Sequence, residues 1–197
     1  MKFKILSVEV NVSFFFFAFL TLMLIIDKTG FVLPVFLATV IHEAGHLAAM
    51  YVLKCQPKKI SLIPGSIQIV RSFCVKRQGE IFILFSGPLA NLTLTALSFL
   101  FYYFTEFDFF FTLSAVNLLV FAFNLLPLRG LDGGSILYIV LEKIFQNAKS
   151  EIIIDIISLA CGVLAVFMGV SGIMSGKINL SLAILGLYLI VGVIIKL

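Results

Sequence analysis

The stretch Phe31–Leu53, FVLPVFLATVIHEAGHLAAMYVL, has the length and apolar character of a membrane-crossing helix, yet three titratable side chains lie at its centre. A spanning helix needs about 17–25 mostly apolar residues, and this run meets that requirement. His42 and His46 are the only histidines of the chain, and Glu43 follows the first of them. Titratable groups inside a bilayer are costly and rare, so this cluster indicates a functional site rather than packing.

The composition of the whole chain is that of an integral membrane protein. Of its 197 residues, 61% are hydrophobic and 12% are charged, and the mean hydropathy is +1.19. Recurrent runs nearly free of charge predict an all-α polytopic membrane protein with six transmembrane helices. The first run could instead be a cleaved signal peptide, but no small-residue cleavage site follows it. The six runs are Val10–Ile26, Phe31–Leu53, Ile81–Phe104, Phe109–Leu128, Ile156–Gly176 and Ile178–Ile195.

The distribution of basic residues predicts the orientation in the membrane. If the six spans alternate, 12 of the 14 lysines and arginines fall on one side, and only Lys28 and Lys177 fall on the other. Positive residues concentrate on the cytosolic side of membrane proteins. We therefore expect a multi-pass protein of the cell membrane with both termini and the Lys54–Gly79 segment in the cytosol. This bias accounts for the basic clusters without a nucleic-acid partner.

The segment between the second and third runs predicts a small cytosolic β-hairpin or sheet. Apolar residues alternate with polar ones on both sides of Pro64-Gly65, a pair that favours turns. A partial alternation before the first run suggests one more strand. We expect a single domain over residues 1–197 without a separate soluble domain. Cys55, Cys74 and Cys161 form no paired motif, and free thiols are expected.

The motif His42-Glu43-Ala44-Gly45-His46 has the H-E-x-x-H spacing of zinc enzymes. Residues four apart share one face of a helix, so both imidazoles point to a common position. In this motif the histidines bind zinc and the glutamate acts as a general base on water. One zinc ion is therefore the predicted cofactor.

Zinc would need a third protein ligand, and since no other histidine exists, a carboxylate is expected. Asp132 differs from the other candidates because Pro127, Gly130 and the pair Gly133-Gly134 break the helix around it. The alternative is that Asp132 only caps the next helix. The candidates are Glu80, Asp132, Glu142, Glu151 and Asp155.

Three motifs together resemble the signatures of the site-2 proteases, which are intramembrane zinc metalloproteases. They are HEAGH, SGPLANL at Ser86–Leu92 and NLLPLRGLDGG at Asn124–Gly134. Small size and the early position of HEAGH are most similar to the subgroup of stage IV sporulation protein FB. The resemblance implies that His42, His46 and Asp132 bind zinc and that Glu43 is the catalytic base.

The resemblance also places two asparagines, Asn91 and Asn124, near the site. Asn91 is a candidate hydrogen-bond donor to the oxyanion, with an interhelical hydrogen bond as the alternative. The chain departs from the family at Arg129-Gly130, where proline is common, so a looser loop is expected. No nucleotide-sensing domain follows the last run, although the sporulation protease commonly carries one.

The activity implied by the resemblance is hydrolysis of membrane-associated proteins near the cytosolic face. The expected substrate is a membrane-tethered regulatory protein, such as a transcription-factor precursor. It would be cut in regulated intramembrane proteolysis during sporulation. Membrane proteins that inhibit or regulate the protease are further candidate partners. The sequence does not indicate an oligomeric state. Alternatives are a zinc transporter, which would need further ligands along a path, and a catalytically inactive membrane scaffold, for which Glu43 would be superfluous. A membrane metalloprotease with glutamate as third ligand and a large cytosolic domain is another alternative.

Overall fold

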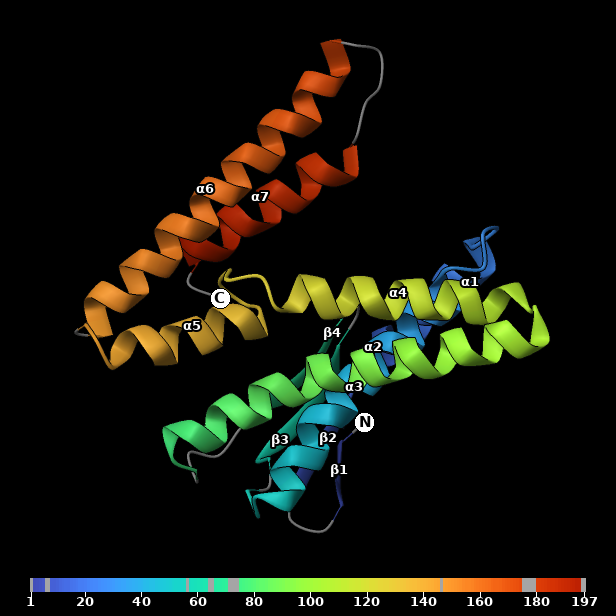
Figure 1. Cartoon of the computed structure of the whole chain (residues 1–197), viewed down its shortest axis with the longest axis horizontal. Coiled ribbons are helices and arrows are strands. Elements are labelled where there is room, and N and C mark those ends of the chain that lie inside the picture. The colour runs from blue at the N-terminus through green and yellow to red at the C-terminus, as the bar shows by residue number, and fades with distance from the viewer. Residues whose placement is uncertain are drawn as a thin grey trace. The chain divides into compact units, whose positions relative to one another are not determined.

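The computed structural model describes residues 2–5, 8–55, 57–63, 66–70, 75–145, 147–174 and 180–195 of the chain. These residues are mostly helical and divide into two compact units, Met1–Ala122 and Phe123–Leu197 (Figure 1). The elements in chain order are β1 (Lys2–Ile5), β2 (Val8–Val12), α1 (Phe14–Ile26), α2 (Val32–Val52), β3 (Lys59–Ile63), β4 (Ser66–Val70), α3 (Arg77–Thr105), α4 (Asp108–Asn124), α5 (Asp132–Glu142), α6 (Asn147–Met174) and α7 (Leu180–Ile195).

The four strands form one sheet in the first unit, in the order β1-β2-β3-β4. The predicted hairpin is confirmed, since β3 and β4 pair antiparallel with Ile60 opposite Ile69 and Leu62 opposite Ile67. The predicted N-terminal strand is also confirmed, but the sheet is larger than expected because that segment forms two strands. β1 pairs antiparallel with β2, and β2 runs parallel to β3. Pro64-Gly65 lies outside the described residues.

The parallel pairing of β2 and β3 fixes the course of the helices between them. Ser13, just before α1, donates its backbone N–H to the carbonyl oxygen of Leu62 at 3.0 Å. Strand β3 follows soon after α2 in the chain. The start of α1 and the end of α2 therefore lie on the same side of this unit, and the two helices together return the chain to the side from which it came.

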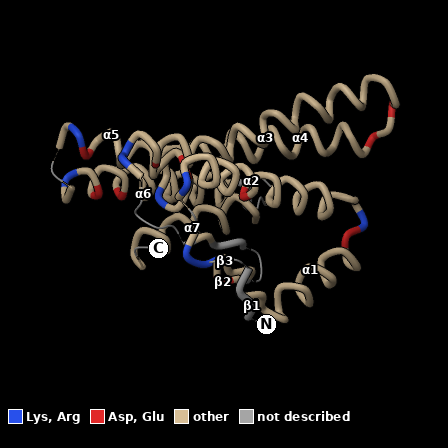
Figure 2. Tube along the Cα trace, turned by 90° about the horizontal axis from the view of Figure 1, so that it is seen from below, with Lys and Arg blue, Asp and Glu red and all other residues tan. Residues whose placement is uncertain are grey.

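Helix α2 packs against α3 through a small buried core. Ala49 and Met50 on α2 contact Ile83 on α3, and Ile69 of the sheet covers this cluster. Helix α3 continues into α4 through an acidic turn at Glu106 and Asp108, and Figure 2 shows both helices without charged residues along most of their length.

In the second unit, α6 and α7 lie side by side (Figure 1). Their close approach depends on small residues, as in many membrane helix pairs. A Cβ on Gly186 would lie 2.5 Å from the carbonyl oxygen of Gly162, and a Cβ on Gly169 would lie 2.7 Å from the backbone nitrogen of Ala183.

Three of the described helices are long and apolar enough to cross a membrane, namely Val32–Val52, Arg77–Thr105 and Asn147–Ser171. The prediction of six spans is therefore not confirmed. Helices α1, α4 and α7 have 13, 17 and 16 residues. For α1 and α4, the charge-free run also includes strand or turn residues. The first run, for example, begins in β2, and the fourth ends in the turn after α4. Many large apolar side chains are exposed along the helices, which suits contact with lipid.

The expectation of free thiols is confirmed for one described cysteine and wrong for the other. Cys55 is disulfide-bonded, whereas Cys161 is free and exposed. Cys74 lies outside the described residues. The prediction for Cys55 is wrong, and no role in the site follows from it.

Candidate metal centre

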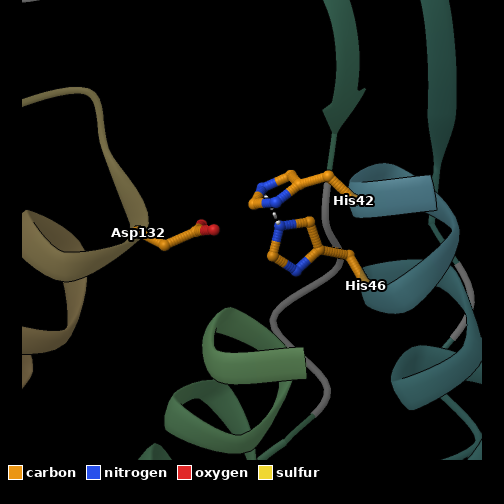
Figure 3. Close-up of side chains that lie close together, drawn as sticks. All are labelled: His42, His46 and Asp132. Carbon is orange, nitrogen blue, oxygen red and sulfur yellow. Dashed lines mark hydrogen bonds between the residues drawn. The ribbon is translucent and has the colours of Figure 1, made fainter. Parts of the chain in front are cut away.

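Two imidazoles project from consecutive turns of α2 toward one another (Figure 3). The residues His42 and His46 are only 6% and 3% exposed, and their Nε2 atoms lie 3.2 Å apart. The ring planes are perpendicular, with centroids 4.7 Å apart. The four-residue spacing predicts this common position, and the structure has the same arrangement.

Two acceptors fix the tautomers of these histidines. Nδ1 of His42 lies 2.8 Å from Oδ1 of Asn91, and Nδ1 of His46 lies 2.7 Å from the carbonyl oxygen of Ile83. A carbonyl oxygen can only accept, so each Nδ1–H donates and each Nε2 carries a lone pair. Two such lone pairs 3.2 Å apart repel each other unless a cation lies between them. Histidines that bind metals are oriented in this way, so the pair fits a metal ion.

Asn91, on α3, is fully buried and connects three helices. Its Nδ2 donates to the carbonyl oxygen of Ala38 on α2 at 2.9 Å and to Oδ1 of Asn117 on α4 at 2.8 Å, while its Oδ1 accepts from His42. An oxyanion donor needs a hydrogen that is not already donated, and both Nδ2 hydrogens are donated here. These are the interhelical hydrogen bonds of the alternative prediction for Asn91, and one of them is to the metal-site candidate His42.

Asn117 is a site residue that the motifs did not identify. It is fully buried on α4, and its Nδ2 donates to the carbonyl oxygen of Leu113 at 2.8 Å, which leaves Oδ1 to accept from Asn91. An amide inside the apolar run Phe109–Leu128 is the signal that could have revealed it. Polar side chains buried between membrane helices need partners and often join helices.

Two glycines allow α2 and α3 to approach closely at the histidines. A Cβ on Gly45 would lie 2.5 Å from the carbonyl oxygen of Ser86. A Cβ on Gly87 would lie 2.5 Å from Cε1 and Nε2 of His46 and 3.0 Å from Cε1 of His42. Pro88, which cannot donate to the backbone, follows Gly87 inside α3. The SGP element therefore shapes the wall of the site.

Asp132 belongs to the second unit, where it is buried at the first position of α5 (Figure 3). The turn before it is tight, since Leu131 donates its N–H to the carbonyl oxygen of Leu128 at 3.2 Å. A Cβ on Gly133 would collide with the carbonyl oxygen of Leu125, and a Cβ on Gly134 with that of Leu128. The Gly-Gly pair thus allows the chain to fold back over the start of α5.

Two other candidate carboxylates are committed to ion pairs. Glu80 pairs with Arg77 at 2.9 Å, and Asp155 pairs with Arg129. Glu142 is partly buried and Glu151 is exposed.

The first unit thus brings together His42, His46 and Asn91, and Glu43 is partly buried beside the pair on α2. Asp132 belongs to the second unit, as does Asn124, the partly buried last residue of α4.

These features define a class of protein. Long apolar helices carry an H-E-x-x-H motif whose histidines are buried, fixed in tautomer and aimed at a common point. This is the arrangement of a metal-binding membrane protein.

The relatives of the chain are consistent with that class. Residues 105–168 match the model of peptidase family M50. The chain is 29% identical over 201 residues to the zinc metalloprotease MJ0392 of Methanocaldococcus jannaschii, a match that covers 94% of this chain but 57% of that relative. A solved structure of a site-2 protease from the same organism is similar with a TM-score of 0.69 and 26% identity, over 98% of this chain and 93% of that one. The chain is thus similar to site-2 proteases and to peptidase family M50, and it spans little more than half the length of the curated relative; the resemblance to the sporulation subgroup is not confirmed.

Proposed function

We propose that the protein is an intramembrane zinc metalloprotease that cleaves membrane-associated proteins near the cytosolic face. The observation that carries the proposal is the orientation of the histidine pair, with both Nδ1–H groups donated and both Nε2 atoms aimed at one point. The adjacent Glu43 supplies the base that a hydrolase needs. The names of the similar proteins support zinc and proteolysis.

One zinc ion would be held by His42, His46 and Asp132, two imidazole nitrogens and a carboxylate oxygen. Catalytic zinc sites use three such ligands and leave a fourth position open. Burial at the end of a tight glycine turn favours Asp132 over the carboxylates of Glu80 and Asp155, which are already in ion pairs.

A zinc ion held by these residues would supply Lewis acidity toward the scissile carbonyl and toward water. Glu43 accepts a proton from the attacking water and delivers it to the departing amine. Asn91 keeps His42 in the tautomer that exposes its Nε2 lone pair to the metal. Glu43 is therefore the catalytic residue of this proposal, and Asn91 acts through His42.

A helical substrate hides its peptide bonds in internal hydrogen bonds, so it must unwind before hydrolysis. Strand β4 is an edge of the described sheet and offers backbone groups to an extended segment. We assign this edge to substrate binding. The proposed substrates are membrane-tethered regulatory proteins, including transcription-factor precursors, and the proposed regulators are membrane proteins that block the site.

The proposed location is the cell membrane, in a multi-pass arrangement with both termini cytosolic. The unequal distribution of lysine and arginine supports it. The parallel pairing of β2 and β3 supports it too, because α1 and α2 together must return the chain to one side. Helices α1, α4 and α7 fall short of the bilayer core of about 30 Å, so extended flanks or local thinning would complete their crossings.

The test of the function is Glu43→Gln in the full chain, purified in detergent and reconstituted into vesicles. We expect one zinc ion per chain by plasma mass spectrometry and no cleavage of a membrane-tethered reporter. His42→Ala should lose both zinc and cleavage, and Glu151→Gln, at an exposed carboxylate on α6, should retain both. Cleavage by the Glu43→Gln variant would refute the hydrolase, and zinc uptake into sealed vesicles would favour transport.

The same variant identifies the substrate class. Membrane proteins that co-purify with Glu43→Gln but not with His42→Ala should include intact precursors that the wild-type protein cuts. Recovery of the same proteins with both variants would show that binding does not depend on the proposed site.

A further inference from the structure

The turn before Asp132 is tied to α6 through one residue, Arg129. Its backbone N–H donates to Oγ of Ser158 at 2.8 Å, and its guanidinium Nε donates to Oδ1 of Asp155. Asp155 and Ser158 lie three residues apart on α6 and therefore share a face of that helix. Two residues on one face of α6 thus bind Arg129, one through its backbone and the other through its side chain.

The ion pair between Arg129 and Asp155 lies in a largely buried, apolar part of the chain, where an unpaired charge would be costly. Asp155 lies within the span Asn147–Ser171, where an ionised carboxylate without a partner would be costly. The Arg129 and Asp155 side chains are only 18% and 23% exposed, and Ser158 is fully buried. An ion pair shielded from water in this way is strongly disturbed when one partner is removed, because the other charge is left behind.

The contact acts on the residues next to Asp132. Gly130 has a positive φ of +85°, a backbone conformation that favours glycine, and a Cβ there would meet nothing within 4 Å. Leu128 is buried, and Gly134 packs directly on its carbonyl oxygen. Displacement of Arg129 would therefore move the turn on which the first residue of α5 depends.

We propose that Arg129, Asp155 and Ser158 form a latch that fixes the turn 128–131 and thereby positions the Asp132 carboxylate for metal binding. The inference rests on the proposed function only in taking Asp132 as a zinc ligand. The latch would thus hold the turn through contacts with α6.

The experiment measures zinc affinity in the full-length protein in detergent, by competition with a chromophoric chelator. Arg129→Ala and Asp155→Asn should each weaken zinc binding about tenfold or more, the range found when groups that orient metal ligands are lost. Ser158→Ala, which removes one hydroxyl, should weaken it about fivefold. The absorption spectrum of the cobalt-substituted protein should change in the same variants, since it reports the geometry of the ligands rather than stability.

Two further variants separate the latch from general destabilisation. The double variant Arg129→Ala/Asp155→Asn should lose no more affinity than the worse single variant, because it leaves no unpaired charge. Arg77→Ala breaks the ion pair with Glu80 at the start of α3, and it should leave affinity and spectrum unchanged. Additive losses in the double variant, or an equal loss in Arg77→Ala, would overturn the latch.

Asp132→Ala distinguishes the two proposals. If Asp132→Ala keeps wild-type zinc affinity, the ligand set of the proposed function is wrong, and the latch falls with it. If Asp132→Ala loses zinc while Arg129→Ala, Asp155→Asn and Ser158→Ala keep the wild-type affinity and cobalt spectrum, the latch alone is overturned.

Discussion

His42 donates its Nδ1–H to Oδ1 of Asn91, 2.8 Å away, and Asn117 holds Asn91 from the opposite side. This series of hydrogen bonds joins α2, α3 and α4. Each amide has only one orientation that satisfies all of its partners. The tautomer of a single imidazole therefore depends on residues on two other helices.

Asn91→Ala should weaken zinc binding by about 10- to 100-fold, because the His42 ring loses the acceptor that orients it. Chelator competition on the purified protein measures this effect. Thr93→Ala on the same helix is the control, since the Thr93 hydroxyl only donates to the carbonyl oxygen of Leu89 within α3. If Asn91→Ala bound zinc as tightly as the wild type, Asn91 would have no role in orienting His42 for the metal.

Asn117→Leu should change zinc affinity in the same direction as Asn91→Ala but less strongly, since it acts through Asn91. The variant Asn91→Ala/Asn117→Leu should bind zinc about as weakly as Asn91→Ala alone, because interactions in one network are not additive. Independent, additive losses measured in the same assay would show that the two amides act separately.

Gly87→Ala should abolish zinc binding and lower the free energy of unfolding by about 1–3 kcal/mol, the usual cost of overpacking. The new Cβ would lie 2.5 Å from the His46 ring. Gly192→Ala on α7 is the matched control, because a Cβ there meets nothing within 4 Å. Zinc content and thermal unfolding in detergent check both variants, and a zinc-loaded Gly87→Ala protein would contradict the close packing described here.

Asp27 predicts a dependence of stability on acidic pH. Its carboxylate accepts hydrogen bonds from the Thr29 hydroxyl and from the backbone N–H groups of Thr29, Gly30 and Val32. The Thr29 hydroxyl and then the Val32 amide contribute most to lowering the pKa of Asp27 from 3.8 to about 2. Because the pKa of Asp27 is lower in the folded state, its carboxylate stabilises the fold at pH values above the pKa of the unfolded state. This stabilisation is lost as the pH falls through the pKa of the folded state.

The unfolding temperature should therefore fall between about pH 4 and pH 2, and Asp27→Asn should flatten this part of the profile. Thr29→Val should raise the pKa of Asp27 toward its ordinary value, which an NMR titration of the side chain measures. If the unfolding temperature of the Asp27→Asn protein fell with pH as steeply as that of the wild type, other groups would cause the pH dependence.

Ile69→Pro removes a backbone donor from β4, the edge strand proposed to bind an unwound substrate. It should reduce reporter cleavage while the protein still binds one zinc ion. Leu62→Pro should be more damaging, because β3 is an inner strand that is hydrogen-bonded to β2 and to β4. Unchanged cleavage by Ile69→Pro would argue against strand pairing with substrate.

Local patterns predicted the parts of the molecule that depend on local geometry. The four-residue spacing of His42 and His46 sets their common position on any helix. Alternation around Pro64-Gly65 likewise predicted the hairpin of β3 and β4, in which the structure places Ile60 opposite Ile69. The number of spans could not be predicted in this way, because a run without charge also includes strand and turn residues.

Contacts between distant segments account for what the motifs missed. Asn117 matters only because Asn91 reaches it from another helix, 26 residues away in the chain. Asp155 was a plausible metal ligand by residue type, and its ion pair with Arg129 is visible only in the fold. Neither relationship leaves a periodic signal in the sequence.

The pairing of β2 with β3 has a consequence for biosynthesis. Strand β2 leaves the ribosome before α1 and α2, yet its parallel partner follows both helices. The sheet can therefore close only after both helices have been synthesised and, in the proposed membrane topology, after they have inserted together. A bulky tag fused to the N-terminus should therefore slow the pairing of β2 with β3. An affinity tag placed elsewhere should leave this pairing unchanged.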